Sequence, residues 1–195
     1  MKTTHLLYLH GFLSSPLSAK ARMTGEVVAR RHPQVVFYCP ALPASPKQAM
    51  DEVLQAIADW PRASMAMMGS SLGGFYATWL AERLGCKAAL LNPAVTPARD
   101  LAAQIGTHAY WHQPDLQFDF TPAHVGELRT LEVPMVSRPE RYCAVIAKGD
   151  EVLDWREMQA FCAGGELRLL PGSDHAISDF DDHIDAVFRF LDLTN

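Results

Sequence analysis

The sequence lacks long apolar runs and clustered positive charge. No apolar stretch approaches the roughly 18 residues that a membrane-spanning helix requires, and the short run from Leu6 to Leu9 is broken by His10 and Gly11. We therefore expect no membrane span, no export signal and a cytoplasmic location. The 17 lysines and arginines are scattered and outnumbered by 22 aspartates and glutamates, for a net charge of −5. This balance argues against binding to nucleic acid or to an anionic membrane.

Cysteine is scarce, and no ligand pattern for a cofactor is present. The four cysteines are far apart and form no Cys-x-x-Cys pair, so we expect reduced, buried thiols rather than disulfides or a zinc site. His108 and His112 stand four apart, but no glutamate follows His108 to complete His-Glu-x-x-His. Glycine-rich phosphate loops are absent as well. We expect no metal and no organic cofactor. The cysteines are Cys39, Cys86, Cys143 and Cys162.

Composition and length fit one folded domain. Hydrophobic residues make up 49% and charged residues 20% of the 195 positions, which excludes intrinsic disorder. Since domains commonly have about 100–200 residues, we expect residues 1–195 to form a single domain with a small insertion.

Short apolar runs alternate with helical patterns along most of the chain. The runs predict strands at residues 6–10, 35–39, 64–69, 87–91, 142–147 and 166–170. Apolar residues at helical spacing predict helices at residues 17–31, 46–60, 72–84, 155–161 and 180–191. Continuous apolar runs are typical of parallel strands that are covered on both faces. We predict about six parallel strands, with helices on both faces and the chain order second, first, third, fourth, fifth, sixth across the sheet.

A glycine-flanked serine follows the third predicted strand. Gly69-Ser70-Ser71-Leu72-Gly73 matches Gly-x-Ser-x-Gly, and it joins an apolar strand to an amphipathic helix. This is the context of a nucleophile elbow, in which the turn is so sharp that glycines are needed on both sides. The motif predicts Ser71 as a nucleophile at the carboxyl end of a strand.

A base and an acid follow later in the chain, each after a predicted strand. His175 lies in the loop after the last strand, and Asp150 comes directly after the strand at residues 142–147. Loops at the carboxyl ends of parallel strands open on the same edge of the sheet, so these side chains are expected to meet Ser71. The order Ser71, Asp150, His175 is that of α/β-hydrolases. Asp154 is the alternative acid, because loop boundaries are uncertain from sequence.

Two backbone amides are candidates for stabilising a negatively charged oxygen. The Leu72 amide opens the helix after Ser71, and the Phe12 amide lies in the loop after the first strand, where Gly11 permits a tight turn. His10 stands at the same strand end. We interpret it as a residue that fixes the loop, with a role as base as the alternative.

Residues 96–140 interrupt the regular alternation. The segment is rich in proline and aromatic residues, and an irregular stretch of this length is typical of a lid over an active site. Its aromatic side chains either form apolar walls for a substrate or anchor the segment to the sheet. The candidate wall residues are Tyr110, Trp111 and Phe118, with Phe120 nearby.

These motifs together resemble the small bacterial YqiA-type esterases of the α/β-hydrolase superfamily. The resemblance runs nearly end to end and is loosest at residues 104–141. It implies a reduced α/β-hydrolase fold and a carboxylic ester or thioester hydrolase with Ser71, Asp150 and His175 as its triad. One departure is Ser173, where a second glycine is expected. The motifs are Leu7-Tyr8-Leu9-His10-Gly11-Phe12, Ser14-Ser15-Pro16, Ser18-Ala19-Lys20-Ala21, Gly69-Ser70-Ser71-Leu72-Gly73-Gly74, Leu91-Asn92-Pro93-Ala94-Val95, Gly149-Asp150-Glu151-Val152 and Gly172-Ser173-Asp174-His175.

The expected function is hydrolysis of a small-molecule acyl ester or thioester through an acyl-enzyme. Two alternatives remain open at this point. The same triad serves acyltransferases and carbon–carbon bond hydrolases, and the fold also occurs in binding proteins without turnover.

Overall fold

A six-stranded parallel sheet forms the centre of the protein. The computed structural model describes residues 2–193. The strands lie in the order β2-β1-β3-β4-β7-β8, and each neighbouring pair is parallel. This is the order predicted from the sequence. The bounds are β1 His5–Leu9, β2 Val36–Tyr38, β3 Met65–Ser70, β4 Lys87–Leu91, β7 Tyr142–Ala147 and β8 Glu166–Leu170.

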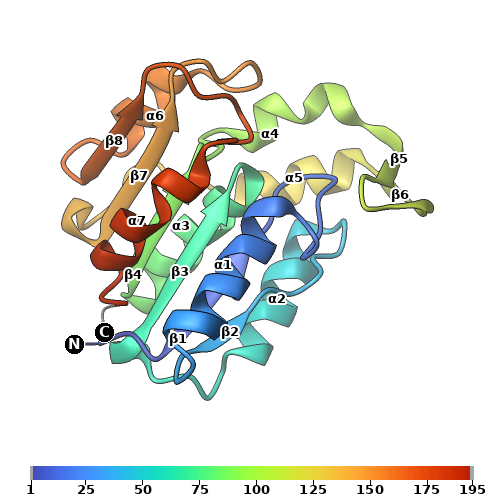
Figure 1. Ribbon diagram of the computed structural model, residues 1–195. Coiled ribbons are helices and arrows are strands. Elements are labelled where there is room, and N and C mark those ends of the chain that lie inside the picture. Colours follow the sequence, from blue (N-terminus) through green and yellow to red (C-terminus); the bar gives the residue numbers. More distant parts are fainter. Residues whose placement is uncertain (1, 194–195) are drawn as a thin grey trace.

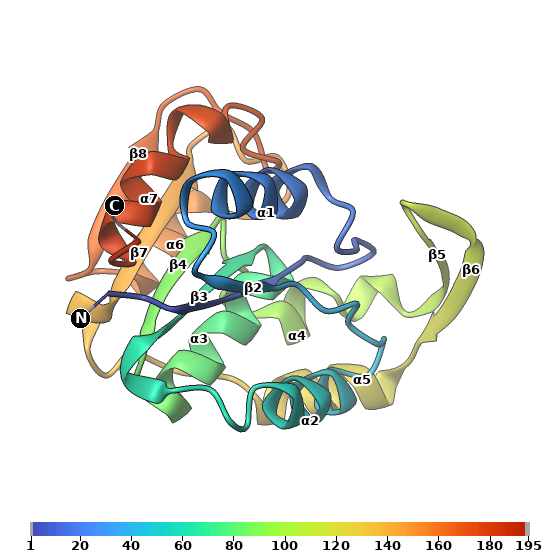
Figure 2. The same cartoon turned by 60° about the horizontal axis from the view of Figure 1, so that its bottom comes forward.

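Helices cover both faces of this sheet (Figures 1 and 2). Helices α1 (Ala19–Arg31) and α7 (Ile184–Phe190) pack on one face. On the other face lie α2 (Pro46–Ala56), α3 (Leu72–Leu84), α5 (Pro122–Thr130) and α6 (Trp155–Phe161). Side chains alternate between the faces along each strand, so Leu6 and Tyr8 join the first core while Leu7 and Leu9 join the second.

Three predicted helix bounds are wrong. The helix predicted at residues 46–60 ends at Ala56, and the last helix begins at Ile184, after a 3₁₀ turn, rather than at residue 180. Ser45 caps α2 by accepting a hydrogen bond from the Gln48 amide, and Gly85 ends α3 with a φ of 76°. The predicted start of α1 at residue 17 is wrong, because Ser18 is the capping residue and the helix begins at Ala19. Residues 11–18 instead form a loop in which the hydroxyl of Ser15 accepts from the Leu17 amide.

The insertion at residues 96–140 contains its own secondary structure. The helix α4 (Pro97–Asp100) and a short 3₁₀ turn lead into an antiparallel hairpin of β5 (Gly106–Tyr110) and β6 (Gln113–Phe120). This hairpin stands out from the rest of the molecule, and α5 then returns the chain to the sheet (Figure 2). The Trp111 amide donates to the carbonyl of Leu13, which ties the hairpin turn to the loop after β1.

The cysteines are free thiols, and three of the four are buried as expected. Cys86, Cys143 and Cys162 are buried and Cys39 is half-buried, all as free thiols. Burial raises the pKa of Cys143 and of Cys162 to about 12. Within residues 2–193, every helix is too short or too polar to cross a membrane.

Candidate active site

Ser71 occupies a strained turn between β3 and α3. Its φ of 56° and ψ of −123° lie in a region that non-glycine residues rarely adopt. The flanking glycines are required by close backbone contacts. A Cβ atom at Gly69 would lie 2.0 Å from the carbonyl oxygen of Gly73, and one at Gly73 would lie 2.0 Å from that of Leu9. The turn therefore holds Ser71 at the carboxyl end of the central strand, as the motif predicts.

The structure brings Ser71, His175 and Asp150 together in one hydrogen-bonded chain. His175 Nε2 lies 3.1 Å from Ser71 Oγ, and His175 Nδ1 lies 2.7 Å from Asp150 Oδ2. Because a carboxylate only accepts hydrogen bonds, Nδ1 carries the proton of the neutral ring. The lone pair of Nε2 is then free to accept the hydroxyl proton of Ser71.

Asp150 is held rigidly. Its side chain is fully buried, with an exposed fraction of 0%. Oδ1 accepts hydrogen bonds from the amides of Val152 and Leu153, both at 2.8 Å, while Oδ2 faces His175. Three N–H donors compensate the buried charge, so the carboxylate remains an acceptor for the imidazole.

Asp154, the alternative acid, has a different task. Its Oδ1 accepts from the Arg156 amide at 2.9 Å and caps helix α6. The structure therefore does not bring Asp154 to the imidazole. Glu151, which follows Asp150 in the chain, does reach the histidine loop, where its Oε2 accepts from the His175 amide at 3.0 Å.

Asn92 belongs to the site through a role that the sequence did not reveal. It follows β4, is fully buried and has a φ of 41°. Its side-chain amide donates to the carbonyls of Asp174 at 3.0 Å and His175 at 3.1 Å, while its oxygen accepts from the Ala147 amide at 2.8 Å. One side chain thus connects the ends of β4 and β7 to the histidine loop. The only sequence signal is the Asn92-Pro93 pair, which is equally typical of a plain turn.

The loop after β1 lies against Ser71. A Cβ atom at Gly11 would lie 3.2 Å from Ser71 Cβ, so glycine permits this close approach. Phe12 and Leu72, whose amides are the predicted oxyanion donors, line the same cleft as Ser71 and His175.

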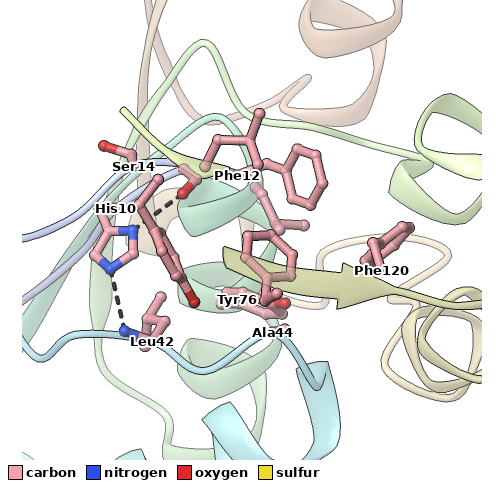
Figure 3. A pocket seen from close by; sticks show the side chains of 12 residues that line it. His10, Phe12, Ser14, Leu42, Ala44, Tyr76 and Phe120 are labelled. Atoms are coloured by element: carbon pink, nitrogen blue, oxygen red, sulfur yellow. Dashed lines mark hydrogen bonds between the residues drawn. The ribbon is translucent and has the colours of Figure 1, made fainter. Parts of the chain in front are cut away.

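His10 fixes this loop (Figure 3). Nδ1 lies 3.0 Å from the Gly11 carbonyl, and the Leu42 amide donates to Nε2 at 3.1 Å. With one nitrogen donating and the other accepting, the ring is neutral, and burial lowers the pKa of His10 further. Both nitrogens are occupied, which agrees with the interpretation of His10 as a loop-fixing residue.

A cleft of about 690 Å³ opens beside Ser71 and His175. Most of its wall is apolar, which is typical of a site for a small organic ligand. Of the aromatic residues predicted as substrate walls, Trp111 lines this cleft, with 68% of its surface exposed. Tyr110 and Phe118 instead line a second cavity of about 30 Å³, which is shown in Figure 3.

The remaining hairpin aromatics act as anchors. The rings of Phe118 and Phe120 pack edge-on against Phe12, with centroids 6.0 and 5.1 Å apart, and Phe120 is buried. The segment thus combines both interpretations of its aromatic residues: Trp111 faces the cleft, whereas Phe118 and Phe120 attach the hairpin to the loop after β1.

The histidine pair of the insertion shows no metal-site geometry. His108 Nε2 lies 2.6 Å from the carbonyl oxygen of Gln104, whereas His112 lines the cleft. Across residues 2–193, histidine, cysteine, aspartate and glutamate side chains form no group of three placed to hold a metal ion.

The sheet order, the strained serine turn and the loops at the strand ends define an α/β-hydrolase fold in reduced form. A family model matches residues 5–192 of the chain. The chain belongs to the Uncharacterised protein family UPF0227, the YqiA family, which confirms the resemblance found in its motifs.

Solved structures share this fold at low sequence identity. A putative hydrolase from Agrobacterium vitis S4 is similar with a TM-score of 0.75 and 16% identity, covering 98% of this chain and 91% of that one. A structure from a study of LipS and LipT, two metagenome-derived lipolytic enzymes, has a TM-score of 0.70 and 17% identity, covering 100% and 96%. Est1E from Butyrivibrio proteoclasticus with bound ferulic acid has a TM-score of 0.67 and 14% identity, covering 98% and 87%.

Proposed function

We propose that the protein is a serine hydrolase that cleaves carboxylic esters or acyl thioesters through an acyl-enzyme. The observation that carries the proposal is the hydrogen-bonded chain from Ser71 through His175 to Asp150. A serine hydroxyl is a poor nucleophile at neutral pH and needs an adjacent base, which in turn needs a group to orient it. The similarity in fold to lipolytic enzymes and to Est1E supports an ester substrate.

The reaction proceeds in two halves. Ser71 Oγ attacks the carbonyl carbon while His175 Nε2 takes its proton, and Asp150 stabilises the resulting imidazolium. The amides of Phe12 and Leu72 stabilise the tetrahedral oxyanion. His175 then gives the proton to the departing alcohol or thiol. Water, activated by the same imidazole, cleaves the acyl-enzyme and restores the free Ser71 hydroxyl. The cycle uses side chains and amides of this chain together with water.

We further propose that residues 96–140 form a lid within a single domain of residues 1–195. Trp111 lines the cleft beside Ser71 and is the residue best placed to contact an acyl chain. Tyr110 and Phe118 line the smaller cavity, so their contribution to substrate binding is indirect, through the packing of the hairpin against Phe12.

The decisive experiment is covalent labelling combined with a substrate panel. A fluorophosphonate probe is expected to label the wild-type protein and not Ser71→Ala. That substitution is expected to lower kcat by roughly 10³-fold or more without changing the fold. Ser70→Ala is the matched control, because Ser70 is the adjacent hydroxyl and lies outside the hydrogen-bonded chain to His175. Nitrophenyl esters and acyl-CoA thioesters of graded chain length then define the acyl group.

Two outcomes overturn the proposal. Turnover of Ser71→Ala close to that of the wild type refutes the nucleophile, and absence of both labelling and hydrolysis favours a binding protein of the same fold. Added alcohols or amines that outcompete water for the acyl-enzyme would instead identify an acyltransferase.

A further inference from the structure

Lys20 places a positive charge in the wall of the cleft. It is the second residue of α1, and among the described residues that line the cleft it is the only lysine or arginine. Its ammonium group donates a hydrogen bond to the carbonyl of Ala176, which also lines the cleft and directly follows His175. The charge therefore lies on the histidine side of Ser71.

Among residues 2–193, this ammonium group has no carboxylate partner. Within residues 2–193, no carboxylate oxygen lies within the 4.0 Å of an ion pair with Lys20. The nearest acidic groups have other hydrogen bonds, Asp150 with His175 and Asp174 with Ser178. An ammonium group has three donors, and the Ala176 carbonyl uses one of them.

The surroundings of Lys20 favour an anion. Lys20 is half-buried, and burial lowers its pKa to about 8. Ser18 and Ala19 line the cleft beside it and open α1, a helix of 13 residues. The first amides of a helix lack partners within it and carry a partial positive charge. The Ser18 hydroxyl already accepts from the Ala21 amide, so the ammonium group of Lys20 is the group that would meet a bound anion.

The chemistry of the proposed reaction decides which part of the substrate meets Lys20. His175 delivers its proton to the departing group, so that group lies on the histidine side of Ser71. We propose that Lys20 binds a carboxylate on the alcohol or thiol portion of the substrate, so that the preferred substrates are esters of a hydroxy or mercapto acid. Asp150 and Asp174 lie near Lys20, and Asp100 and Glu151 also line the cleft. One ammonium group among these carboxylates matches a monoanion better than a dianionic phosphate. The inference rests on the proposed function.

The test compares two esters that differ in one charge. In 3-carboxyphenyl butyrate and 3-carbamoylphenyl butyrate, the carboxylate and the carboxamide are nearly equal in shape. The wild type is expected to prefer the carboxylate in kcat/KM, after each value is divided by the alkaline hydrolysis rate of that ester. Lys20→Met is expected to lower this preference about 10-fold or more, as for a lost hydrogen bond to a charged group. Lys20→Arg keeps the charge and is expected to retain a preference.

Arg22→Met is the matched control. Arg22 lies on the same helix, is exposed, pairs with Glu26 at 3.8 Å and does not line the cleft. The Arg22→Met substitution removes one positive charge from the same helix. It is expected to leave the ratio of kcat/KM between the two esters unchanged. Loss of the Ala176 hydrogen bond lowers the rate with both esters alike and so leaves the ratio as it is.

The outcomes separate this inference from the function on which it rests. Hydrolysis of both esters without a carboxylate preference, or with one that Lys20→Met retains, overturns the inference and leaves the hydrolase standing. Thermal unfolding with each product, 3-hydroxybenzoate or 3-hydroxybenzamide, measures the same preference without turnover. Equal stabilisation by the two products overturns the anion site even where neither ester is cleaved. Failure of both cleavage and Ser71 labelling overturns the proposed function itself.

Discussion

Asn92 offers the sharpest test of how the site is assembled. In Asn92→Ala, the amide of Ala147 and the carbonyls of Asp174 and His175 lose their partner at a fully buried position. Leaving a buried polar group unpaired costs about 1–3 kcal/mol. For three groups that partly find new partners, we expect a loss of roughly 3–5 kcal/mol in the free energy of unfolding. For a chain of this size that corresponds to about 6–20 °C in Tm.

Asn92→Asp removes the hydrogen-bond donors of Asn92 while keeping the volume of its side chain, so the two effects can be measured separately. Aspartate matches asparagine in size, tolerates the positive φ and still accepts from the Ala147 amide. It replaces the donor, however, with an oxygen that faces the carbonyls of Asp174 and His175. Repulsion and a buried charge should therefore make this variant at least as unstable as Asn92→Ala.

The assay combines thermal unfolding by circular dichroism with kinetics below each transition. Both variants are expected to lower kcat on nitrophenyl butyrate and to slow fluorophosphonate labelling, because the backbone that carries His175 loses its anchor. An Asn92→Asp protein with the Tm and kcat of the wild type would refute the reasoning, since its donors would then contribute nothing.

Three further predictions follow from single contacts. Asp150→Asn is expected to lower kcat about 10⁴-fold, as a wrongly held imidazole tautomer does, whereas Asp154→Asn is expected to keep activity because asparagine caps a helix as well as aspartate does. Equal losses in the two variants would contradict the assigned acid. Trp111→Ala should change the ratio of kcat/KM between long and short acyl esters by about 10-fold. Its Tm should change little, because the Trp111 side chain is exposed and the backbone amide makes the link to the loop after β1. Equal losses on all esters with a lowered Tm would mean a structural role. The ring of His32 is buried with no hydrogen-bond partner in the part of the chain that the structure describes, and burial lowers its pKa. Below about pH 6.5 the unfolded chain therefore binds a proton at His32 that the folded chain excludes. Stability therefore falls with acidification, and His32→Leu should gain more over the wild type in urea unfolding at pH 5 than at pH 8; an equal difference at both values would show that His32 does not titrate.

The parallel sheet and the sharp turn at Ser71 could be predicted from the sequence because their signals are local. Five consecutive residues around Ser71 predict the turn, and the continuous apolar runs of the strands predict that both faces of the sheet are covered. The predicted start of α1 lies two residues too early because Ser14-Ser15-Pro16 is itself a typical helix-start pattern. In the structure the Ser18 hydroxyl accepts from the Ala21 amide and caps α1.

The hairpin within the insertion and the role of Asn92 could not be predicted from the sequence, for physical reasons. The hairpin turn at Trp111 and His112 lacks the Asn-Gly or Asp-Gly signal of tight hairpins, and Pro114 argues against a strand. Both strands of this hairpin are edges, where proline is tolerated. The partners of Asn92 lie 55, 82 and 83 residues away in the chain, so no local pattern reports them.

Phe12 belongs to two parts of the molecule at once. Its backbone lies in the loop beside Ser71, and its ring is the centre of the aromatic packing that holds the hairpin. A substitution that reshapes the ring therefore shifts both the attachment of the hairpin and the amide proposed to meet the oxyanion. Turnover rate and acyl selectivity cannot be tuned separately at this position. In a directed-evolution library we expect altered chain-length profiles to arise at the turn of the hairpin, with position 12 remaining aromatic.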